Sequence, residues 1–488
     1  MYKKFKKIVF LSSILGLCFS CQTTPERPNI LFIAVDDLRP DLGCYGNSLV
    51  QSPNLDRLAQ KSTLFTHHFV TVPTCGASRQ SLLTGIRPLT KAYLRNDIIE
   101  KVLADKAEGD IPESFIHQLK RNGYYTVGIG KISHSADGLL YGYTATPSTK
   151  KELPHSWSEL LFDAGKWKTG WNAFFGYADG ENRQSLNKQV RPYEAAAVSD
   201  TSYVDGLTAQ LAIKKLQALK TVRQPFFMGV GFFKPHLPFT APQKYWDLYD
   251  RAEIPVAPHS QLPENVSLKS LHPSNEFNQY ALGEEKASLD AAVSEAYAKK
   301  IRHAYFAAVS YVDAQIGLVL DALKALDLDK NTIVVVWGDH GWHLGDQQVW
   351  GKHTLFENAL KSPLIIHLPG ATTPRSITSI TETVDLYPTL LELANVNFSH
   401  PIDGASLVPQ LQGKKNTDEV AYSYYNNGIS LRTQRYRLTK YWREESPTLE
   451  LYDHETDPFE TRNIAQEQAE IVAQLLPLLE KGNTGIYP

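Results

Sequence analysis

The chain has 488 residues, a length that allows a large core and at most about three domains. Its formal net charge of −2, with 21% charged residues and no basic run beyond the N-terminus, excludes the basic surface typical of nucleic-acid-binding proteins. An apolar fraction of 42%, with 24 Tyr and 20 Phe, is ordinary for an enzyme and also suits a cleft that binds sugars.

The first 21 residues predict a secretory leader. The basic segment Met1–Lys7 precedes the apolar segment Ile8–Phe19, which is too short to span a membrane in the mature protein. A loose lipobox ends at Cys21, with Cys18 where leucine is usual, so lipidation of Cys21 is left open. We therefore expect export, either to the periplasm or to a lipid anchor on the outer membrane of a Gram-negative bacterium.

Two aspartates follow the first predicted strand. Asn29–Val35 is a continuous apolar run, as expected for a parallel strand buried on both faces, and Asp36 and Asp37 come directly after it. Ligands of open α/β sheets bind beyond the carboxyl ends of the strands. Adjacent carboxylates there are costly to bury unless they meet a cation; the alternative is a helix cap or a loop pair. Pro53–Ala59 starts the next helix.

The segment Thr71–Gly85 places Cys75 at the start of a short helix. Such a helix start offers free backbone N–H groups and the positive end of a dipole, which favour an anion. Arg79 follows one turn later on the same face, and its planar fork suits a phosphate or sulfate oxygen. The alternative is a structural cysteine next to a surface arginine.

Two later strands are followed by basic side chains. Tyr124–Ile129 leads to Lys131 and His134. Pro225–Phe232 leads to His236, which two prolines hold stiffly, as a proton donor requires; the alternative is a turn histidine that is hydrogen-bonded locally. The segments around these strands are a helix over Ile111–Gly123, a long excursion over Tyr141–Glu194 that we expect to shape a substrate pocket, and a helix over Asp205–Leu219.

A second acidic strand end follows Asn331–Trp337, where Asp339 and His340 come directly after Gly338. Two acidic strand ends in one sheet favour a metal site over separate loop caps. Lys352 follows shortly afterwards. The neighbouring elements are a long amphipathic helix over Ala291–Leu326, a strand over Pro363–His367 and a helix that begins at Val384.

The sequence changes in character near Lys414, where short alternating stretches predict a small antiparallel sheet closed by a terminal helix. The stretches are Val420–Tyr425, Ser430–Lys440 and Leu449–Asp453, and the helix is Gln466–Lys481. We assign residues 1–21 to the leader, 22–413 to a catalytic domain and 414–488 to a small α+β subdomain without a catalytic motif of its own.

The motif Cys75-x-Ala77-x-Arg79, extended from Ser81 to Gly85, resembles the maturation and active-site signature of type I, formylglycine-dependent sulfatases. The pattern is most similar to iduronate-2-sulfatases and bacterial polysaccharide sulfatases, since many other sulfatases carry Asp-Asn in place of Asp339-His340. Ser133 stands where relatives often have an aromatic residue. The other pieces occur in the family's order along nearly the whole mature chain: Asp36-Asp37, Gly130 to His134, Lys234 to Pro238, Gly338 to Gly341 and Gly351 to His353.

The resemblance implies an α/β, alkaline-phosphatase-like fold: a large mixed, mostly parallel sheet flanked by helices, plus a small C-terminal antiparallel sheet with a helix. It implies a sulfuric ester hydrolase that removes O-sulfate from sulfated polysaccharides or their oligosaccharides. Ulvan, glycosaminoglycans and uronate 2-O-sulfates are all open as substrates. A maturation enzyme would oxidise Cys75 to formylglycine, whose hydrate attacks sulfur. One Ca²⁺ is implied, with ligands from Asp36, Asp37, Cys75, Asp339 and His340.

The resemblance also implies roles for the remaining charged side chains. Arg79, Lys131 and Lys352 would offset the charge on the sulfuryl oxygens together with the cation. His340, an unusual calcium ligand, is also a candidate contact for a sulfate or hydrate oxygen.

Acid and base assignments stay open at this point. His236, with or without Lys352, would protonate the departing sugar oxygen. His134 or Asp339 would accept the proton of the remaining hydroxyl. A closed pocket would make the protein an exo-enzyme that acts on terminal sugars.

Three other interpretations compete with this one. A disulfide between Cys44 and Cys75 is the alternative for an exported protein, whereas a sulfatase requires an unpaired Cys44 and a mature residue 75 without sulfur. A phosphomonoester or phosphonate hydrolase of the alkaline phosphatase superfamily would commonly use two zinc ions and more histidine ligands. A catalytically dead glycan-binding protein would have lost a member of the set, and none is missing.

Overall fold

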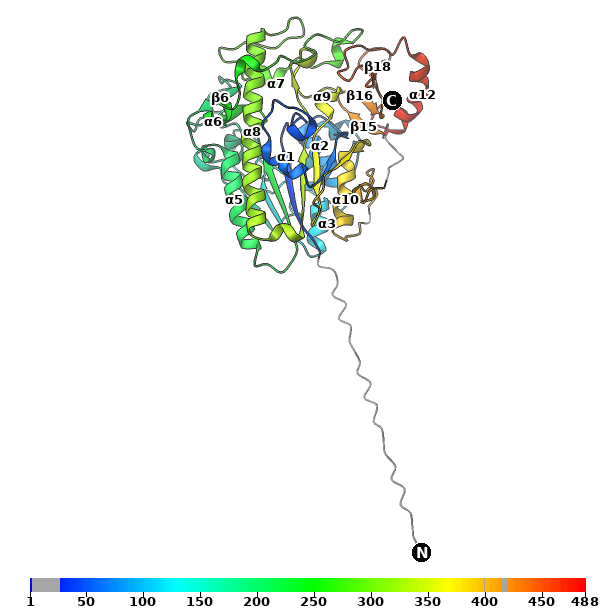
Figure 1. The fold of residues 1–488 in the computed structure, drawn as a ribbon. Coiled ribbons are helices and arrows are strands. Elements are labelled where there is room, and N and C mark those ends of the chain that lie inside the picture. Colours follow the sequence, from blue (N-terminus) through cyan, green and yellow to red (C-terminus); the bar gives the residue numbers. More distant parts are fainter. Residues whose placement is uncertain (2–26, 399, 415–419) are drawn as a thin grey trace.

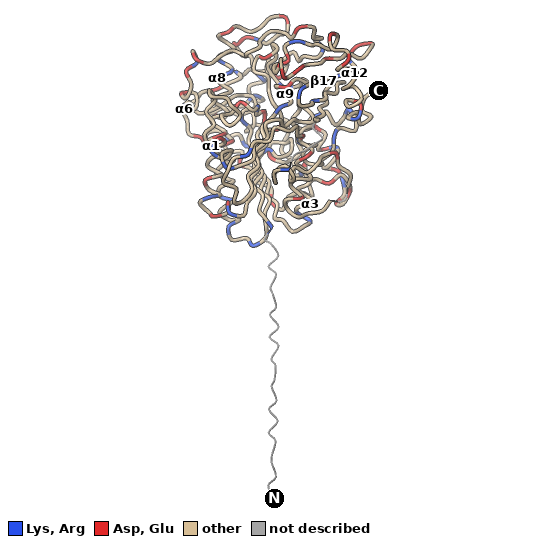
Figure 2. The backbone as a smooth tube through the Cα atoms, turned by 45° about the vertical axis from the view of Figure 1, so that its right-hand side comes forward, with Lys and Arg blue, Asp and Glu red and all other residues tan. Residues whose placement is uncertain are grey.

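The computed structural model describes residues 1, 27–398, 400–414 and 420–488 (Figure 1). The predicted leader, with Cys18 and Cys21, lies outside the described residues apart from Met1. Basic and acidic residues are interspersed along the described chain, as the blue and red segments of Figure 2 show.

An eight-stranded mixed sheet forms the centre of the fold, in the order β13-β2-β12-β9-β1-β7-β4-β5. Neighbours from β9 to β5 run parallel, whereas β12 is antiparallel to both β9 and β2. The predicted mixed, mostly parallel sheet is therefore confirmed. Its strands are β1 (Asn29–Val35), β2 (Thr63–Phe65), β4 (Tyr125–Gly130), β5 (Glu159–Leu161), β7 (Phe226–Phe232), β9 (Thr332–Gly338), β12 (Leu364–His367) and β13 (Arg375–Ile377).

Strand β1 lies between β7 and β9, and its residues from Ile30 to Val35 have no exposed surface. Both faces are covered, which explains why its sequence is continuously apolar. The register pairs Val35 with Gly338 of β9, and the Asp339 N–H donates to the Val35 carbonyl at 3.2 Å. This register brings the two acidic strand ends together.

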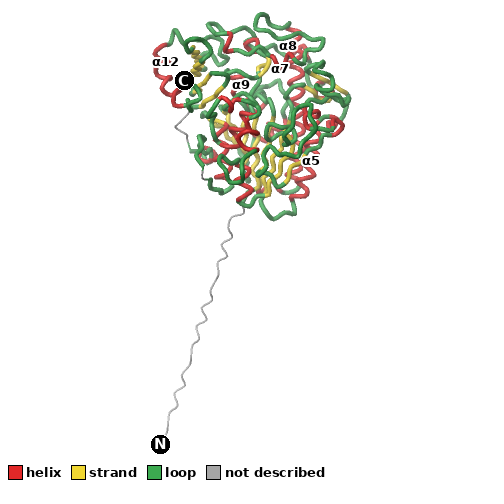
Figure 3. The backbone as a smooth tube through the Cα atoms, turned by 180° about the vertical axis from the view of Figure 1, so that it is seen from behind, coloured by secondary structure: helices red, strands yellow, loops and turns green. Residues whose placement is uncertain are grey.

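Helices cover both faces of the sheet (Figures 1 and 3). Alternate residues of β1 face opposite sides: Leu31, Ile33 and Val35 belong to one apolar cluster, and Ile30 and Phe32 belong to the other. The first cluster contains residues of α1 (Pro53–Ala59), α5 (Val204–Leu219) and α8 (Glu295–Ala325), and the second contains residues of α2 (Cys75–Thr84), α3 (Phe115–Arg121) and α10 (Leu386–Leu393). Within the described residues only α8 is long and apolar enough to cross a membrane, and 72% of its most apolar window is buried in the protein.

Two predicted segments differ in the structure. Helix α3 begins at Phe115 rather than at Ile111, because the Ser114 side chain caps it by accepting a hydrogen bond from the His117 N–H at 3.0 Å. The excursion over Tyr141–Glu194 is not only a loop, since its strand β5 pairs with β4 and extends the central sheet. Its other elements are α4 (Gly170–Phe174) and the start of β6 (Tyr193–Ala196).

Short elements complete this part of the chain: β3 (His68–Phe69), α6 (Gln243–Trp246), α7 (Asn275–Asn278), β8 (Phe239–Pro242), β10 (His343–Leu344), β11 (Trp350–Gly351), α9 (Glu357–Leu360), β14 (Thr381–Glu382) and α11 (Val408–Leu411).

A separate four-stranded antiparallel sheet follows, in the order β15-β16-β17-β18, and α12 (Ala469–Lys481) packs on β16 and β17. The stretch Ser430–Lys440, predicted as one strand, contains parts of two, because a turn between Thr433 and Tyr436 reverses the chain. The strands are β15 (Ala421–Tyr424), β16 (Gly428–Arg432), β17 (Tyr436–Tyr441) and β18 (Thr448–Asp453).

Candidate active site

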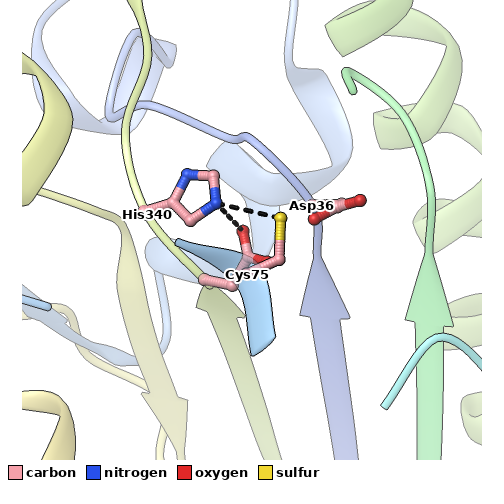
Figure 4. Close-up of side chains that lie close together, drawn as sticks. Asp36, Cys75 and His340 are labelled. Carbon is pink, nitrogen blue, oxygen red and sulfur yellow. Dashed lines mark hydrogen bonds and ion pairs between the residues drawn. The ribbon is translucent and has the colours of Figure 1, made fainter. Parts of the chain in front are cut away.

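Cys75 is the first residue of α2, and its side chain points toward His340, which follows β9 (Figure 4). Its Sγ is 3.2 Å from Nε2 of His340 and 3.4 Å from Nζ of Lys352. The Gly76 N–H donates to Oδ1 of Asn96 at 2.9 Å, so one of the N–H groups that we expected to be free for an anion is already bonded.

Both Cys44 and Cys75 are free, so the disulfide interpretation is wrong. Burial, and after it the nearby Asp36 carboxylate, raises the pKa of the Cys75 thiol well above its usual value. An unmodified Cys75 is therefore a protonated thiol, which is a weak nucleophile.

Three buried aspartates from two adjacent strands meet beside Cys75. The Asp37 N–H donates to Oδ1 of Asp339 at 3.0 Å. Lys131 Nζ lies 2.6 Å from Oδ2 of Asp36, and Lys352 Nζ lies 2.8 Å from Oδ1 of Asp37. Although burial opposes ionisation, the Lys131 ammonium holds the pKa of Asp36 well below its usual range.

The donor atoms of this cluster suit a metal ion. Oδ1 of Asp36 and Oδ2 of Asp37 are buried and have no hydrogen-bond partner among the described residues. Buried carboxylate oxygens of this kind are costly unless a cation binds them, and a donor set rich in oxygen favours Ca²⁺. The residues therefore fit the expected calcium ion. Within this cluster, the ligand atoms of Asp36, Cys75, Asp339 and His340 all lie within 4.8 Å of one another. The same holds for the set formed by Asp37, Cys75 and His236.

Arg79 lies between the two acidic strand ends, with no exposed surface. Its Nε is 3.0 Å from Oδ2 of Asp339, and its Nη2 is 3.5 Å from Oδ1 of Asp36. Its Nη1 donates to the carbonyls of Lys131 and Ile132. The guanidinium therefore holds two carboxylates in place, and it does not line the cavity that is described next.

A cavity of about 520 Å³ opens onto Cys75. The other side chains of the predicted catalytic set that line it are Lys131, His134, His236 and Lys352. The fold thus brings these residues together from segments far apart in the sequence.

Sequence reasoning missed Glu276, an acidic residue of α7 that lines the same cavity. Its Oε1 is 3.3 Å from Nε2 of His236, and its Oε2 is 3.6 Å from Nζ of Lys352. Despite burial, the Lys352 ammonium, and after it His236, keeps the pKa of Glu276 well below its usual range. No motif surrounds Glu276 in the sequence, so only its position in space identifies it.

His134 and Lys352, both in the predicted catalytic set, have different charge states. Burial, and after it the Lys131 ammonium, lowers the pKa of His134 well below its usual value, so the imidazole is neutral. Lys352 is the opposite case: burial opposes its charge, but the Asp37 carboxylate raises its pKa well above the usual value. Lys352 therefore remains a cation at neutral pH.

The excursion Tyr141–Glu194 supplies much of the cavity wall, as we expected. The ring of Trp171 lies 5.6 Å from that of His134, and the ring of Phe174 lies 4.6 Å from that of His236. Aromatic side chains therefore hold both histidines. The other wall residues from this segment, none of which the sequence identified individually, are Tyr143, Thr144, Phe175, Arg183, Gln184 and Lys188.

The chain matches two family models. One, described as Sulfatase, covers residues 28–396, and the other, described as N-sulphoglucosamine sulphohydrolase, C-terminal, covers residues 338–484.

Known proteins are similar over most of the chain. A protein named Sulfatase from Formosa agariphila is 32% identical, over 95% of this chain and 91% of its own length. Iduronate 2-sulfatase of Mus musculus is 34% identical, over 75% of this chain and 69% of its own length. The solved structure of a phosphonate monoester hydrolase from Silicibacter pomeroyi has a TM-score of 0.72 at 24% identity, and covers 94% of this chain and 95% of that chain. This last likeness shows the shared fold alone, and it confirms the alkaline-phosphatase-like architecture.

Proposed function

The chain belongs to the sulfatase family, and on this premise we propose that it hydrolyses the O-sulfate ester of a sugar from a sulfated polysaccharide, using formylglycine at position 75 and one Ca²⁺. The observation that carries the proposal is the cavity that joins Cys75 to the predicted catalytic residues Lys131, His134, His236 and Lys352. Lys131 and Lys352 offer positive charge to the sulfuryl oxygens. Calcium, when bound by the aspartates, supplies Lewis-acid polarisation of the same oxygens.

The first step forms a covalent sulfo-enzyme. Oxidation by the maturation enzyme removes the sulfur of Cys75 and leaves an aldehyde, whose hydrate has two hydroxyl groups. One hydroxyl group releases its proton to water in the cavity, and its oxygen attacks sulfur while the bond between sulfur and the sugar oxygen breaks. His236 gives its proton to the departing sugar oxygen, and Glu276, 3.3 Å from its Nε2, holds the ring toward the cavity.

The second step restores the aldehyde. The remaining hydroxyl loses its proton, the carbon–oxygen bond to the sulfate breaks, and free sulfate leaves. We assign the proton to His134, because it is neutral and lines the cavity. Asp339, the other candidate, already accepts hydrogen bonds from Arg79 and from the Asp37 N–H.

We propose exo action on a terminal sugar, with a uronate 2-O-sulfate as one candidate substrate. The aromatic wall supports a sugar ligand, and Tyr143 at this wall is 43% exposed, so part of its side chain is accessible to a sugar. Sulfate release from internal positions of an intact polymer would contradict exo action.

The main alternative is hydrolysis of phosphate monoesters or phosphonates, and the fold is shared with a phosphonate monoester hydrolase. The test compares sulfate, phosphate and phosphonate esters on protein matured with a formylglycine-generating enzyme. We expect sulfate esters to be hydrolysed fastest, and Cys75→Ala to reduce the rate at least about 10³-fold. Mass spectrometry of the peptide around position 75 should find an aldehyde and no sulfur. An active protein that keeps this sulfur, or a preference for phosphate, would overturn the proposal.

We also propose export from the cytoplasm, for which the N-terminal basic and apolar segments are the support. Cell fractionation with and without globomycin treatment would separate periplasmic from lipid-anchored protein.

A further inference from the structure

Arg183 is a buried cation that has no carboxylate partner among the described residues. Its side chain lines the cavity, and the residue is only 5% exposed. Nη1 donates to the Tyr280 hydroxyl at 2.9 Å, whereas Nε is buried and has no hydrogen-bond partner in the described part of the chain. A buried guanidinium without an anion is costly, which indicates that the anion comes from a ligand.

Aromatic rings fix the orientation of this guanidinium. Its central carbon lies 3.6 Å from the ring centroid of Phe175, 5.4 Å from that of Tyr280 and 5.7 Å from that of Tyr143. The ring faces stabilise the positive charge, but they cannot accept hydrogen bonds from the N–H groups that lie in the plane of the guanidinium. The result is a pre-oriented fork that matches the two oxygens of a carboxylate or sulfate.

A short chain of aromatic contacts connects Arg183 to the reaction centre. Phe175 packs against Phe174 with 4.5 Å between ring centroids, and the Phe174 ring lies 4.6 Å from Nζ of Lys131. Arg183 is therefore separated from the sulfate-binding lysines by one pair of aromatic rings.

The cavity cations divide into two groups. Lys131 and Lys352 are paired with Asp36 and Asp37, respectively. Arg183 and the exposed Lys188, both on the segment Tyr141–Glu194, line the cavity and belong to no ion pair among the described residues. Glu276, which also lines the cavity, pairs with His236 and Lys352 instead.

Building on the proposed function, we propose that Arg183 determines substrate specificity by binding a second anionic group on the sulfated sugar, either a carboxylate or a second sulfate. Lys188 adds positive charge at the mouth of this subsite. The substrate is then a sugar with two negative groups, one at the reaction centre and one at Arg183.

The experiment uses two matched substrate pairs. One pair is a sulfated hexuronic acid and its methyl ester, and the other is a disulfated hexosamine and its monosulfated counterpart. We expect Arg183→Gln to lower kcat/KM for a doubly charged substrate about 10- to 100-fold, as for a lost charge-assisted hydrogen bond, and to change the singly charged partner less than about threefold. The pair that responds identifies the carboxylate or the second sulfate as the group bound.

Further variants separate specificity from folding. Arg183→Lys keeps the charge without the fork and should retain part of the discrimination, even if Arg183→Gln does not fold. Tyr280→Phe removes one hydrogen bond to Arg183 and should retain most of the discrimination between doubly and singly charged substrates. Arg191→Gln, an exposed arginine on the same segment outside the cavity, is the matched control and should leave both pairs unchanged.

Binding gives a second readout that needs no turnover. Titration calorimetry of Cys75→Ala protein should show tighter binding of the doubly charged sugar in at least one pair, and Cys75→Ala combined with Arg183→Gln should lose that difference. Equal binding within both pairs, or equal loss of kcat/KM for the doubly and singly charged partners, would overturn the subsite. Failure to hydrolyse any sulfate ester, 4-nitrophenyl sulfate included, would instead count against the proposed function.

Discussion

Arg79 and Asp339 form an ion pair in which neither side chain has any exposed surface, with 3.0 Å between Nε and Oδ2. The same guanidinium reaches toward Asp36, so a single cation links the ends of β1 and β9. This link holds the acidic strand ends close enough to share a metal ion.

Replacing Arg79 with methionine should destabilise the protein strongly in the presence of a chelator. The variant leaves the buried Asp339 carboxylate without an arginine or lysine partner among the described residues, which costs about 3–5 kcal/mol. Thermal unfolding with EDTA should show a lower midpoint, and added Ca²⁺ should recover part of the loss. Arg57→Met, which removes an exposed ion pair with Asp321, is the control and should change stability by less than about 1 kcal/mol. Equal effects of the two substitutions would contradict the role of Arg79.

Calcium should stabilise the unmodified protein without any substrate. Ligand binding to the folded state contributes about 2.7 kcal/mol when the ligand concentration is 100 times Kd. The unfolding midpoint should therefore rise with added Ca²⁺, and Asp37→Asn should abolish most of that rise, since it removes a buried carboxylate whose Oδ2 has no hydrogen-bond partner among the described residues. A midpoint that does not respond to Ca²⁺ in the parent protein would refute the assigned metal site.

His236 and Glu276 should matter most when the leaving group is poor. A sugar alkoxide needs a proton as the bond to sulfur breaks, whereas 4-nitrophenolate hardly does. His236→Gln should reduce kcat about 10²-fold or more on a sugar sulfate and less than about tenfold on 4-nitrophenyl sulfate. Glu276→Gln should show the same selectivity more weakly, because it acts by positioning the ring. Equal losses on both substrates would instead indicate a purely structural or metal-binding role.

Glu450 should make the protein less stable as the pH rises from about 4.5 to 7. Burial in the C-terminal part raises the pKa of this carboxyl group to about 7, while the Ser270 hydroxyl donates to it at 2.6 Å. A raised pKa means that the folded state favours the protonated form. Its stabilising contribution is therefore complete below the unfolded pKa, decreases as the pH rises toward 7, and then remains constant.

The Glu450→Gln variant measures this contribution directly. The difference in unfolding free energy between variant and parent should change by about 2–3 kcal/mol in favour of the variant between pH 5 and pH 8. Glu445→Gln, at an exposed position of the same region, should show no such pH-dependent difference. A difference for Glu450→Gln that is constant with pH would show that the carboxyl group does not titrate in this range.

Strong apolar patterns in the sequence predicted the central elements well. The predicted strand Asn29–Val35 and the start of the helix at Pro53 agree with β1 and α1, because a strand covered on both faces must be apolar throughout and proline favours the first turn of a helix. Edge strands carry no such pattern. Strand β5 is only partly buried along its length, and its sequence predicted a loop.

The candidate catalytic residues could be named from the sequence, since Asp36, Cys75 and His236 follow predicted strands or begin a helix and Lys352 stands in a motif of the family. Only the tertiary structure showed that Arg79 faces two carboxylates and that Glu276 and Arg183 belong to the cavity. The physical reason is that contacts of loop residues depend on packing against partners far away in the chain, as Glu276 with Lys352 and Arg183 with Tyr280 show. No local periodicity encodes such contacts, whereas the burial of a strand is recorded residue by residue in its own sequence.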